Sequence, residues 1–202
     1  MNVQFPDCLR PFFGPHLIWR KESSSRVIYL TFDDGPVPEV TPTVLDILDV
    51  HSIKATFFCV GENVEKHPEI YNNIISRGHR TGNHSYNHLK GFETENSEYV
   101  ENIRKAARLI KSRLFRPPYG RIKPKQLKVL RNEFDIVMWD VITHDYDKSL
   151  SNDKVFRNVT RYSRNGSIVV FHDSVKAMGN MLNVLPKAIE FWKTNGYSFG
   201  TL

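Results

Sequence analysis

Cysteine is scarce in this chain, and the sequence has no long hydrophobic run. Cys8 and Cys59 are its two cysteines among 202 residues, which excludes a disulfide framework and a redox motif of paired cysteines. Prolines and charged residues interrupt the apolar residues near the N-terminus, so this segment reads as neither a signal peptide nor a membrane span. We therefore expect a cytoplasmic protein by default, or an extracytoplasmic one if the start is processed or truncated.

The sequence also has no internal repeat, no low-complexity run and no linker rich enough to divide it. We expect one domain at residues 26–202, preceded by residues 1–25, an N-terminal strap whose aromatic side chains pack on that domain. A hydrophobic content of 40% with 12% aromatic residues excludes a disordered chain. The net charge is +6, but the basic residues are scattered, so we expect a solvated surface and no nucleic-acid partner.

Short apolar runs alternate with segments of helical periodicity along the whole domain. Strands are expected at residues 27–30, 54–60, 79–82, 114–116, 136–139, 167–171 and 197–202. Helices are expected at residues 41–51, 68–78, 97–112, 151–163 and 185–194, with a further one headed by Pro124. This alternation predicts parallel βαβ units, which close into a barrel or form a doubly wound sheet. In a parallel barrel, functional residues gather where the strands end.

Two adjacent carboxylates, Asp33 and Asp34, come directly after the first predicted strand and before the turn residues Gly35 and Pro36. Neighbouring carboxylates repel each other, and holding them close is costly unless a cation or a proton relieves the repulsion. A solvated turn would have the same composition. The pair taken alone therefore leaves a metal site, an acid/base site and a plain turn open.

His84 and His88 lie four residues apart, and we place them on one face of a helical turn, from which both imidazoles can bind one metal ion. A lone pair of this kind is more often two surface histidines. With Asp34 the pair makes a three-ligand set, which leaves one coordination position open for water or substrate. That arrangement is typical of a catalytic zinc site rather than a structural one.

Four motifs follow one another in the order found in the polysaccharide deacetylases of carbohydrate esterase family 4, the NodB-homology domain. They are Thr31-Phe32-Asp33-Asp34-Gly35-Pro36, Asn83-His84-Ser85-Tyr86-Asn87-His88, Arg116-Pro117-Pro118-Tyr119-Gly120 and Val170-Phe171-His172. The chain resembles that family over residues 26–202. The resemblance implies a distorted (β/α)7 barrel and a metal-dependent hydrolase that removes N-acetyl groups from N-acetylglucosamine-type glycans, such as peptidoglycan or chitin-like polymers.

The resemblance also implies a role for each motif residue. Asp34, His84 and His88 would hold a divalent ion, with zinc expected and cobalt, nickel or manganese as alternatives. Asp33 would act as the general base and His172 as the general acid.

Four further residues would surround the reacting group. Arg116 would pair with Asp33 and keep it ionised, and the backbone N–H of Tyr119 would complete an oxyanion hole. Trp139 and Tyr146 would line the pocket for the acetyl group.

One position departs from the family pattern. Ile142 stands where we expect the aspartate that orients the catalytic histidine, and an apolar side chain cannot fix the tautomer of an imidazole. Asp140 and Asp145 are the nearby carboxylates able to compensate. We therefore expect weaker or differently tuned activity.

Several functions stay open besides the N-deacetylase. The same scaffold would suit an O-acetyl esterase acting on xylan-type polymers or an amidase acting on a small cyclic amide. The loss at Ile142 would also suit a metal-containing carbohydrate binder with little turnover. The sequence predicts no oligomeric state.

Overall fold

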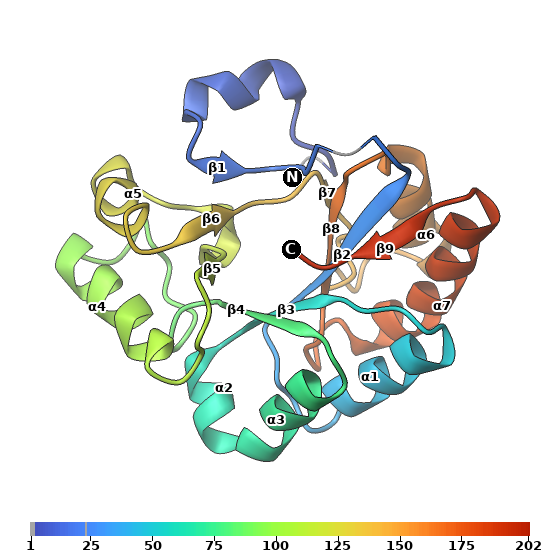
Figure 1. Cartoon of the computed structure of the whole chain (residues 1–202), viewed down its shortest axis with the longest axis horizontal. Coiled ribbons are helices and arrows are strands. Elements are labelled where there is room, and N and C mark those ends of the chain that lie inside the picture. Colours follow the sequence, from blue (N-terminus) through green and yellow to red (C-terminus); the bar gives the residue numbers. More distant parts are fainter. Residues whose placement is uncertain (1–2, 23) are drawn as a thin grey trace.

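A parallel β-sheet curls through the centre of the molecule, with helices along its outer side (Figure 1). The computed structural model describes residues 3–22 and 24–202, and within them it has nine strands in the order β1-β6-β5-β4-β3-β2-β8-β7, with β9 paired to β2. Met1, Asn2 and Ser23, which belong to the predicted strap, lie outside the described residues. The architecture is the expected distorted (β/α)7 barrel.

The strands are β1 Leu17–Ile18, β2 Val27–Asp33, β3 Thr56–Cys59, β4 Arg80–Asn83, β5 Leu114–Phe115, β6 Asp135–Val137, β7 Val141–Ile142, β8 Ile168–His172 and β9 Ser198–Gly200. The helices are α1 Thr41–Val50, α2 Gly61–Lys66, α3 Pro68–Ser76, α4 Asn96–Ala107, α5 Pro124–Leu130, α6 Asn152–Tyr162 and α7 Met178–Thr194. Two short 3-10 helices, η1 Asp7–Phe13 and η2 Pro118–Gly120, complete the set.

The strands β1 and β7, the helix α2 and the two 3-10 helices were not predicted from the sequence. The two strands have only two residues each, which is too short to show a period, and their positions are set by pairing with β6 and β8. Helix α7 begins at Met178 rather than at the predicted Leu185, with Pro186 inside it. Proline favours a first helical turn, but burial of the inner face against the sheet carries this helix through it.

The core explains why the central strands are hydrophobic on both faces. Strand β2 pairs with β3 on one side and β8 on the other, and the ring of Phe32 packs against those of Phe57 and Phe171. A parallel strand covered on both faces has no solvated side, so it reads as a continuous apolar run. The charged or ionisable side chains Asp33 and His172 accordingly stand at the ends of β2 and β8.

The N-terminal segment, with its 3-10 helix η1, lies along the side of the barrel that the α-helices of the described residues leave uncovered (Figure 1). Its strand β1 pairs with β6, and single bridges join Gln4 to Val141 and Arg20 to Ser167. The segment thus spans the seam between the two ends of the sheet.

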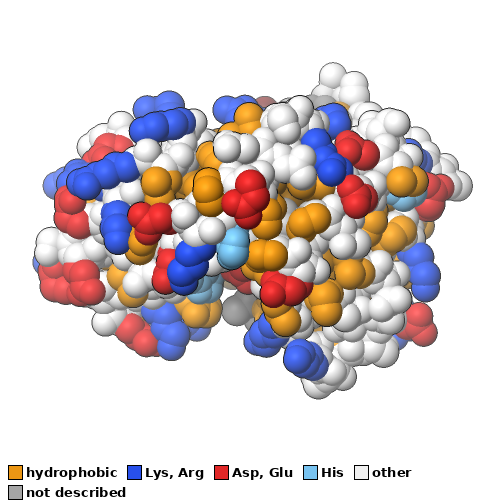
Figure 2. Space-filling view, turned by 90° about the horizontal axis from the view of Figure 1, so that it is seen from below, with side chains coloured by type: hydrophobic (Ala, Val, Ile, Leu, Met, Phe, Trp, Pro, Cys, Tyr) orange, Lys and Arg blue, Asp and Glu red, His pale blue; other side chains and the backbone are white. Residues whose placement is uncertain are grey.

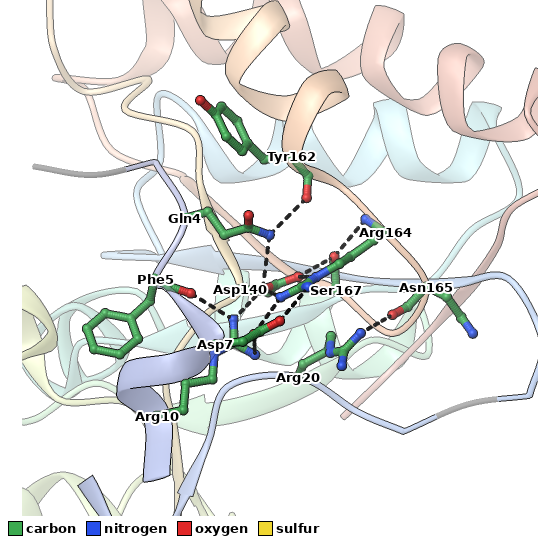
Figure 3. Close-up of polar contacts among 10 residues, drawn as sticks. All are labelled: Gln4, Phe5, Asp7, Arg10, Arg20, Asp140, Tyr162, Arg164, Asn165 and Ser167. Atoms are coloured by element: carbon green, nitrogen blue, oxygen red, sulfur yellow. Dashed lines mark hydrogen bonds and ion pairs between the residues drawn. The ribbon is translucent and has the colours of Figure 1, made fainter. Parts of the chain in front are cut away.

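A buried carboxylate fastens this segment to the barrel (Figure 3). Asp140 accepts hydrogen bonds from Ser167 Oγ at 2.7 Å and from Arg164 Nε at 3.0 Å, and it also pairs with the guanidinium of Arg10. Burial alone would raise the pKa of Asp140, but these donors hold it below its ordinary value. Removing one partner of such a buried ion pair is costly, so the network holds the segment in place.

Charged side chains of both signs are interspersed over the face on the side of α2 and α3 (Figure 2). Among the described helices, none combines the length and the apolar character that a membrane crossing requires.

Candidate metal and catalytic site

The register of the sheet brings the sequence motifs to one rim. Asp33, the last residue of β2, lies beside His172, the last residue of β8. On the other side, β4 ends at Asn83 next to Phe115 of β5, so that His84 and Arg116 leave neighbouring strands at the same level. Every predicted site residue therefore lies at the carboxyl end of a strand or in the segment that follows it, as a parallel barrel requires.

Asp34 turns its side chain toward the two histidines through an unusual backbone conformation. Its φ is 86°, in the left-handed region, and its carbonyl oxygen accepts a hydrogen bond from Asn63 Nδ2 at 2.8 Å. Its Oδ1 lies 3.3 Å from His88 Nε2 and 3.8 Å from His84 Nε2. Burial opposes ionisation, but the nearby imidazoles hold the pKa of Asp34 well below its usual range.

The buried imidazole of His84 has a defined tautomer. Its Nδ1–H donates to the carbonyl oxygen of Arg116 at 2.8 Å, which leaves Nε2 with a free lone pair toward Asp34. Burial lowers the pKa of His84 to about 4 despite the neighbouring carboxylates, so the ring is neutral at pH 7. A neutral imidazole oriented by a backbone carbonyl is the form that binds a metal ion.

The two histidines lie in a loop, so the prediction of a helical turn is wrong. Residues 84–88 have no helical hydrogen bonds, and both Ser85 and His88 have positive φ values, 66° and 57°. Side-chain amides satisfy the backbone instead. Ser85 N–H donates to Asn83 Oδ1, and Tyr86 N–H donates to Asn102 Oδ1.

Three donor atoms, one each from Asp34, His84 and His88, lie within 4.8 Å of one another. Two imidazole nitrogens with one carboxylate oxygen suit zinc and its divalent neighbours. The ring of Tyr119 packs edge-on against His88 at 4.7 Å, which limits the positions that this imidazole can take. The donor set and its spacing fit a divalent metal ion.

Asp33 is held by a fully buried cation. Arg116 Nη1 donates to Asp33 Oδ1 at 2.6 Å and to Thr31 Oγ1 at 2.9 Å, while Nη2 donates to Met138 O at 3.0 Å. The guanidinium also lies 4.0 Å from the ring centroid of Phe58. The predicted pair of Arg116 and Asp33 is present, and Asp33 Oδ2 stays free toward His84 Nε2 at 4.0 Å.

His172 is oriented by Asp145, one of the two carboxylates that the sequence analysis names as able to replace the missing aspartate. Its Nδ1–H donates to Asp145 Oδ1 at 2.8 Å, and its backbone N–H donates to Oδ2 at 2.8 Å. Burial lowers the pKa of His172, but Asp145, together with Asp34, outweighs this effect and raises it to about 9. Of the two carboxylates considered as replacements for the aspartate missing at position 142, Asp145 is the one that binds His172, and Asp140 belongs to the N-terminal network instead.

A cavity of about 380 Å³ contains the metal ligands, Asp33 and His172. Trp139, Ile142 and Tyr146 form its apolar wall, and Tyr119 lines it as well. The ring of Tyr146 meets His172 edge-on at 4.9 Å. The structure thus brings the predicted site residues to one cavity, except for Arg116, which is fully buried and reaches the site through its ion pair with Asp33.

Three residues of this site were missed by reasoning from the sequence. Lys176 lines the cavity with its ammonium 5.2 Å from the ring centroid of Tyr146. His144, which also has a positive φ, hydrogen-bonds the Tyr146 hydroxyl through Nδ1 at 3.0 Å. The only available signal for either was proximity in sequence to a motif.

The third is Asp173, whose carboxyl group binds the turn that follows Asp33 and Asp34. Its Oδ1 accepts from the Gly35 N–H at 3.0 Å, and its Oδ2 accepts from Thr41 Oγ1 at 2.6 Å. Complete burial, with the charge of Asp34 nearby, raises the pKa of Asp173 to about 8. A Cβ at Gly35 would lie 2.0 Å from Asp173, so only glycine fits here.

Comparisons with known proteins agree with this geometry. The sequence model of the family described as polysaccharide deacetylase matches residues 20–133, more than half of the chain. A peptidoglycan-N-acetylglucosamine deacetylase of Bacillus cereus is 39% identical over 183 residues, which cover 87% of this chain and 66% of the relative. This chain therefore matches slightly less than two thirds of that relative's length.

Two further proteins extend the likeness. A chitooligosaccharide deacetylase of a Bradyrhizobium species is 33% identical over 171 residues, with 81% of this chain and 78% of that protein covered. The crystal structure of the Bc1960 peptidoglycan N-acetylglucosamine deacetylase superposes with a TM-score of 0.88 at 36% identity, and covers 98% of this chain and 95% of that one. With the family model, the sequence identities and the superposition in agreement, the chain belongs to the polysaccharide deacetylases of carbohydrate esterase family 4.

Proposed function

We propose that the protein is a zinc-dependent hydrolase that removes N-acetyl groups from N-acetylglucosamine units of a glycan such as peptidoglycan or a chitin-like oligomer. One observation carries the proposal. A three-ligand metal set, a carboxylate held by a buried arginine and an imidazole held by a buried aspartate share a single cavity of about 380 Å³. Amide hydrolysis requires a proton acceptor and a proton donor at the reacting group, and this cavity contains both.

Asp34, His84 and His88 would hold the ion. A divalent ion in such a site supplies Lewis acidity, which polarises a carbonyl and lowers the pKa of a water molecule. Asp33 takes the proton of the attacking water, because its Oδ1 is bound to Arg116 while Oδ2 is left to accept.

His172 donates the proton that the departing amine needs. Asp145 binds Nδ1, so the proton available to the substrate is the one on Nε2, and the raised pKa keeps the ring protonated at pH 7. The apolar wall of Trp139, Ile142 and Tyr146 suits the methyl group of an acetamide and excludes water from that side. The names of the relatives given above support N-acetylglucosamine glycans as the substrate class.

The test is release of acetate from N-acetylated chitooligosaccharides and from peptidoglycan fragments, measured before and after chelation and again after zinc or cobalt is added back. We expect chelation to abolish release and zinc to restore it. His88→Ala should abolish metal binding and release, whereas His67→Ala, at a histidine outside the cavity, should retain both.

Three outcomes would contradict the proposal. Release that survives complete chelation would exclude metal dependence. Release from acetylated xylan but not from the N-acetylated substrates would assign the site to an O-acetyl esterase. Metal and oligosaccharide binding without any release would leave a carbohydrate binder.

A further inference from the structure

An apolar groove of about 450 Å³ lies beside the metal cavity. Its walls come from two distant parts of the chain. The N-terminal segment supplies Phe5, Phe13, Leu17 and Trp19, and the opposite wall is formed by Phe92, residues 119–122, Met138 and Trp139. We call this set the aromatic groove.

The aromatic groove and the metal cavity share part of their walls. Tyr119, Gly120 and Trp139 line both of them. A Cβ at Gly120 would lie 2.2 Å from Trp139 Cη2, and the φ of Gly120 is 64°, so glycine is required for the indole to lie here. Trp139 is therefore set between the two depressions, and a long ligand bound in one can continue into the other.

The aromatic side chains of the N-terminal segment are arranged before any ligand binds. Phe5 stacks on Trp19 at 4.3 Å, and Phe13 meets Phe5 edge-on at 5.3 Å. The segment is fixed to the barrel through the pair of Arg10 with buried Asp140 (Figure 3). A preformed wall costs less conformational entropy on binding than a mobile one.

Exposure separates the groove from an ordinary core. Phe13 is 50% and Phe92 is 54% exposed, although both line the groove. Among the described residues that line it, Arg121 is the one with a charged side chain. Exposed aromatic rings gathered in one concave place indicate a binding surface. Phe12, the neighbour of Phe13 in the same 3-10 helix, is 84% exposed but lies outside the groove.

We propose that the aromatic groove, one wall of which comes from the N-terminal segment, binds the sugar units adjoining the N-acetylated unit in the metal cavity. The proposal rests on the proposed function. Pyranose rings present apolar C–H faces between their hydroxyl groups, and flat aromatic side chains match those faces. Arg121 supplies hydrogen-bond donors for the hydroxyl groups.

The experiment compares kcat/KM for N-acetylated chitooligosaccharides from two to six units on the wild-type protein, Phe13→Ala, Phe92→Ala and the matched control Phe12→Ala. We expect kcat/KM of the wild-type protein to rise with chain length. In Phe13→Ala and Phe92→Ala the ratio of long to short substrate should fall roughly fivefold, as expected for the loss of one partly buried aromatic contact. Phe12→Ala should keep the wild-type ratio.

An equal loss of kcat/KM at every chain length would overturn the proposal. A lowered melting temperature that accounts for the loss of kcat/KM would overturn it as well. So would variants whose ratio is that of the wild-type protein. A change in preference between acetyl and longer acyl groups, at constant chain length, would assign the groove to the acyl chain instead.

Failure of the proposed function can be told apart from failure of the groove. If no oligosaccharide releases acetate, calorimetric titration of the six-unit oligosaccharide still tests the groove. Binding that is weakened in Phe13→Ala but not in Phe12→Ala would support it, and equal binding by both, or none by the wild-type protein, would exclude it.

Discussion

Asp145 binds His172 twice, through the imidazole Nδ1 and through the backbone N–H, each at 2.8 Å. The carboxylate therefore fixes both the ring and the end of β8 that carries it. It also fixes the tautomer, because a carboxylate accepts the Nδ1 proton and leaves the Nε2 side for the substrate. The function of His172 as a proton donor thus depends on a residue that follows a different strand.

Replacing Asp145 with asparagine should lower kcat by at least tenfold and shift the pH profile. His172 donates a proton only while it is protonated, so activity falls as the pH rises through the pKa of His172, about 9. Without the charge of Asp145 this pKa falls, and the descending limb should move to lower pH. Measuring kcat between pH 6 and pH 10 for both proteins tests this, and an unmoved limb would assign the pH dependence to another group.

The same pair affects stability with a defined sign. A histidine whose pKa is raised on folding contributes stability below its unfolded value of about 6.5, and this contribution is lost as the pH rises toward about 9. In Asp145→Asn the free energy of unfolding should therefore depend less on pH over that range. Denaturant titrations at pH 6 and pH 9 provide the measurement.

Arg116→Met should destabilise the fold, because it leaves the buried carboxylate of Asp33 without its cation. Loss of one partner of a buried ion pair costs about 3–5 kcal/mol, and here Thr31 and Met138 lose their donors as well. The double variant Arg116→Met with Asp33→Asn should regain part of this stability, since no unpaired charge remains. If the double variant is no more stable than the single one, the cost arises from lost packing on Phe58 rather than from the charge.

Asp173→Asn should cost less than about 1 kcal/mol at pH 7, because a carboxyl group with a pKa near 8 is largely neutral there and asparagine has the same shape. The pH dependence provides the sharper test. An acid whose pKa is raised on folding binds more protons in the folded state between about pH 4 and pH 8, so the wild-type free energy of unfolding contains a part that falls as the pH rises.

This part should be absent in Asp173→Asn, so the variant should gain stability relative to the wild-type protein on going from pH 5 to pH 8. Urea titrations at the two pH values give the comparison. A variant that instead loses stability relative to the wild-type protein on going from pH 5 to pH 8 would show that Asp173 is ionised in the fold.

Much of the site could be predicted because parallel strands present their carboxyl ends at one rim. That rule alone places Asp33 and His172 together, and the register pairs them directly. The conformation of the histidine loop could not be predicted in this way. The loop conformation depends on Asn102 of α4, whose side-chain oxygen accepts a hydrogen bond from the Tyr86 N–H. Spacing along the chain does not show such a partner.

Contacts distant in sequence also account for what was missed elsewhere. Strand β1 forms because Leu17 and Ile18 pair with residues of β6. A segment of two residues is too short to show a hydrophobic period in the sequence. The position of Asp145 opposite His172 depends on how the loop after β7 folds back on β8. Asp140 was equally plausible as a carboxylate for His172, and only the structure shows it bound to Arg10 and Arg164.

The pair of His144 and Tyr146 gives the last prediction. The Tyr146 hydroxyl hydrogen-bonds His144 Nδ1 at 3.0 Å, and the ring of Tyr146 rests against His172. Tyr146→Phe keeps the ring but frees it to move, so we expect kcat to fall a few fold, as for one lost hydrogen bond of about 1 kcal/mol, with KM little changed.

His144→Gln should produce a similar fall, and the double variant should be no worse than either single one, because both changes break the same contact. A double-mutant cycle on kcat measures this coupling directly. Additive losses would mean that the two residues act independently, and Tyr146 would then contribute only its surface to the cavity. Since neither residue binds the metal, zinc affinity measured in parallel should be that of the wild-type protein in all three variants.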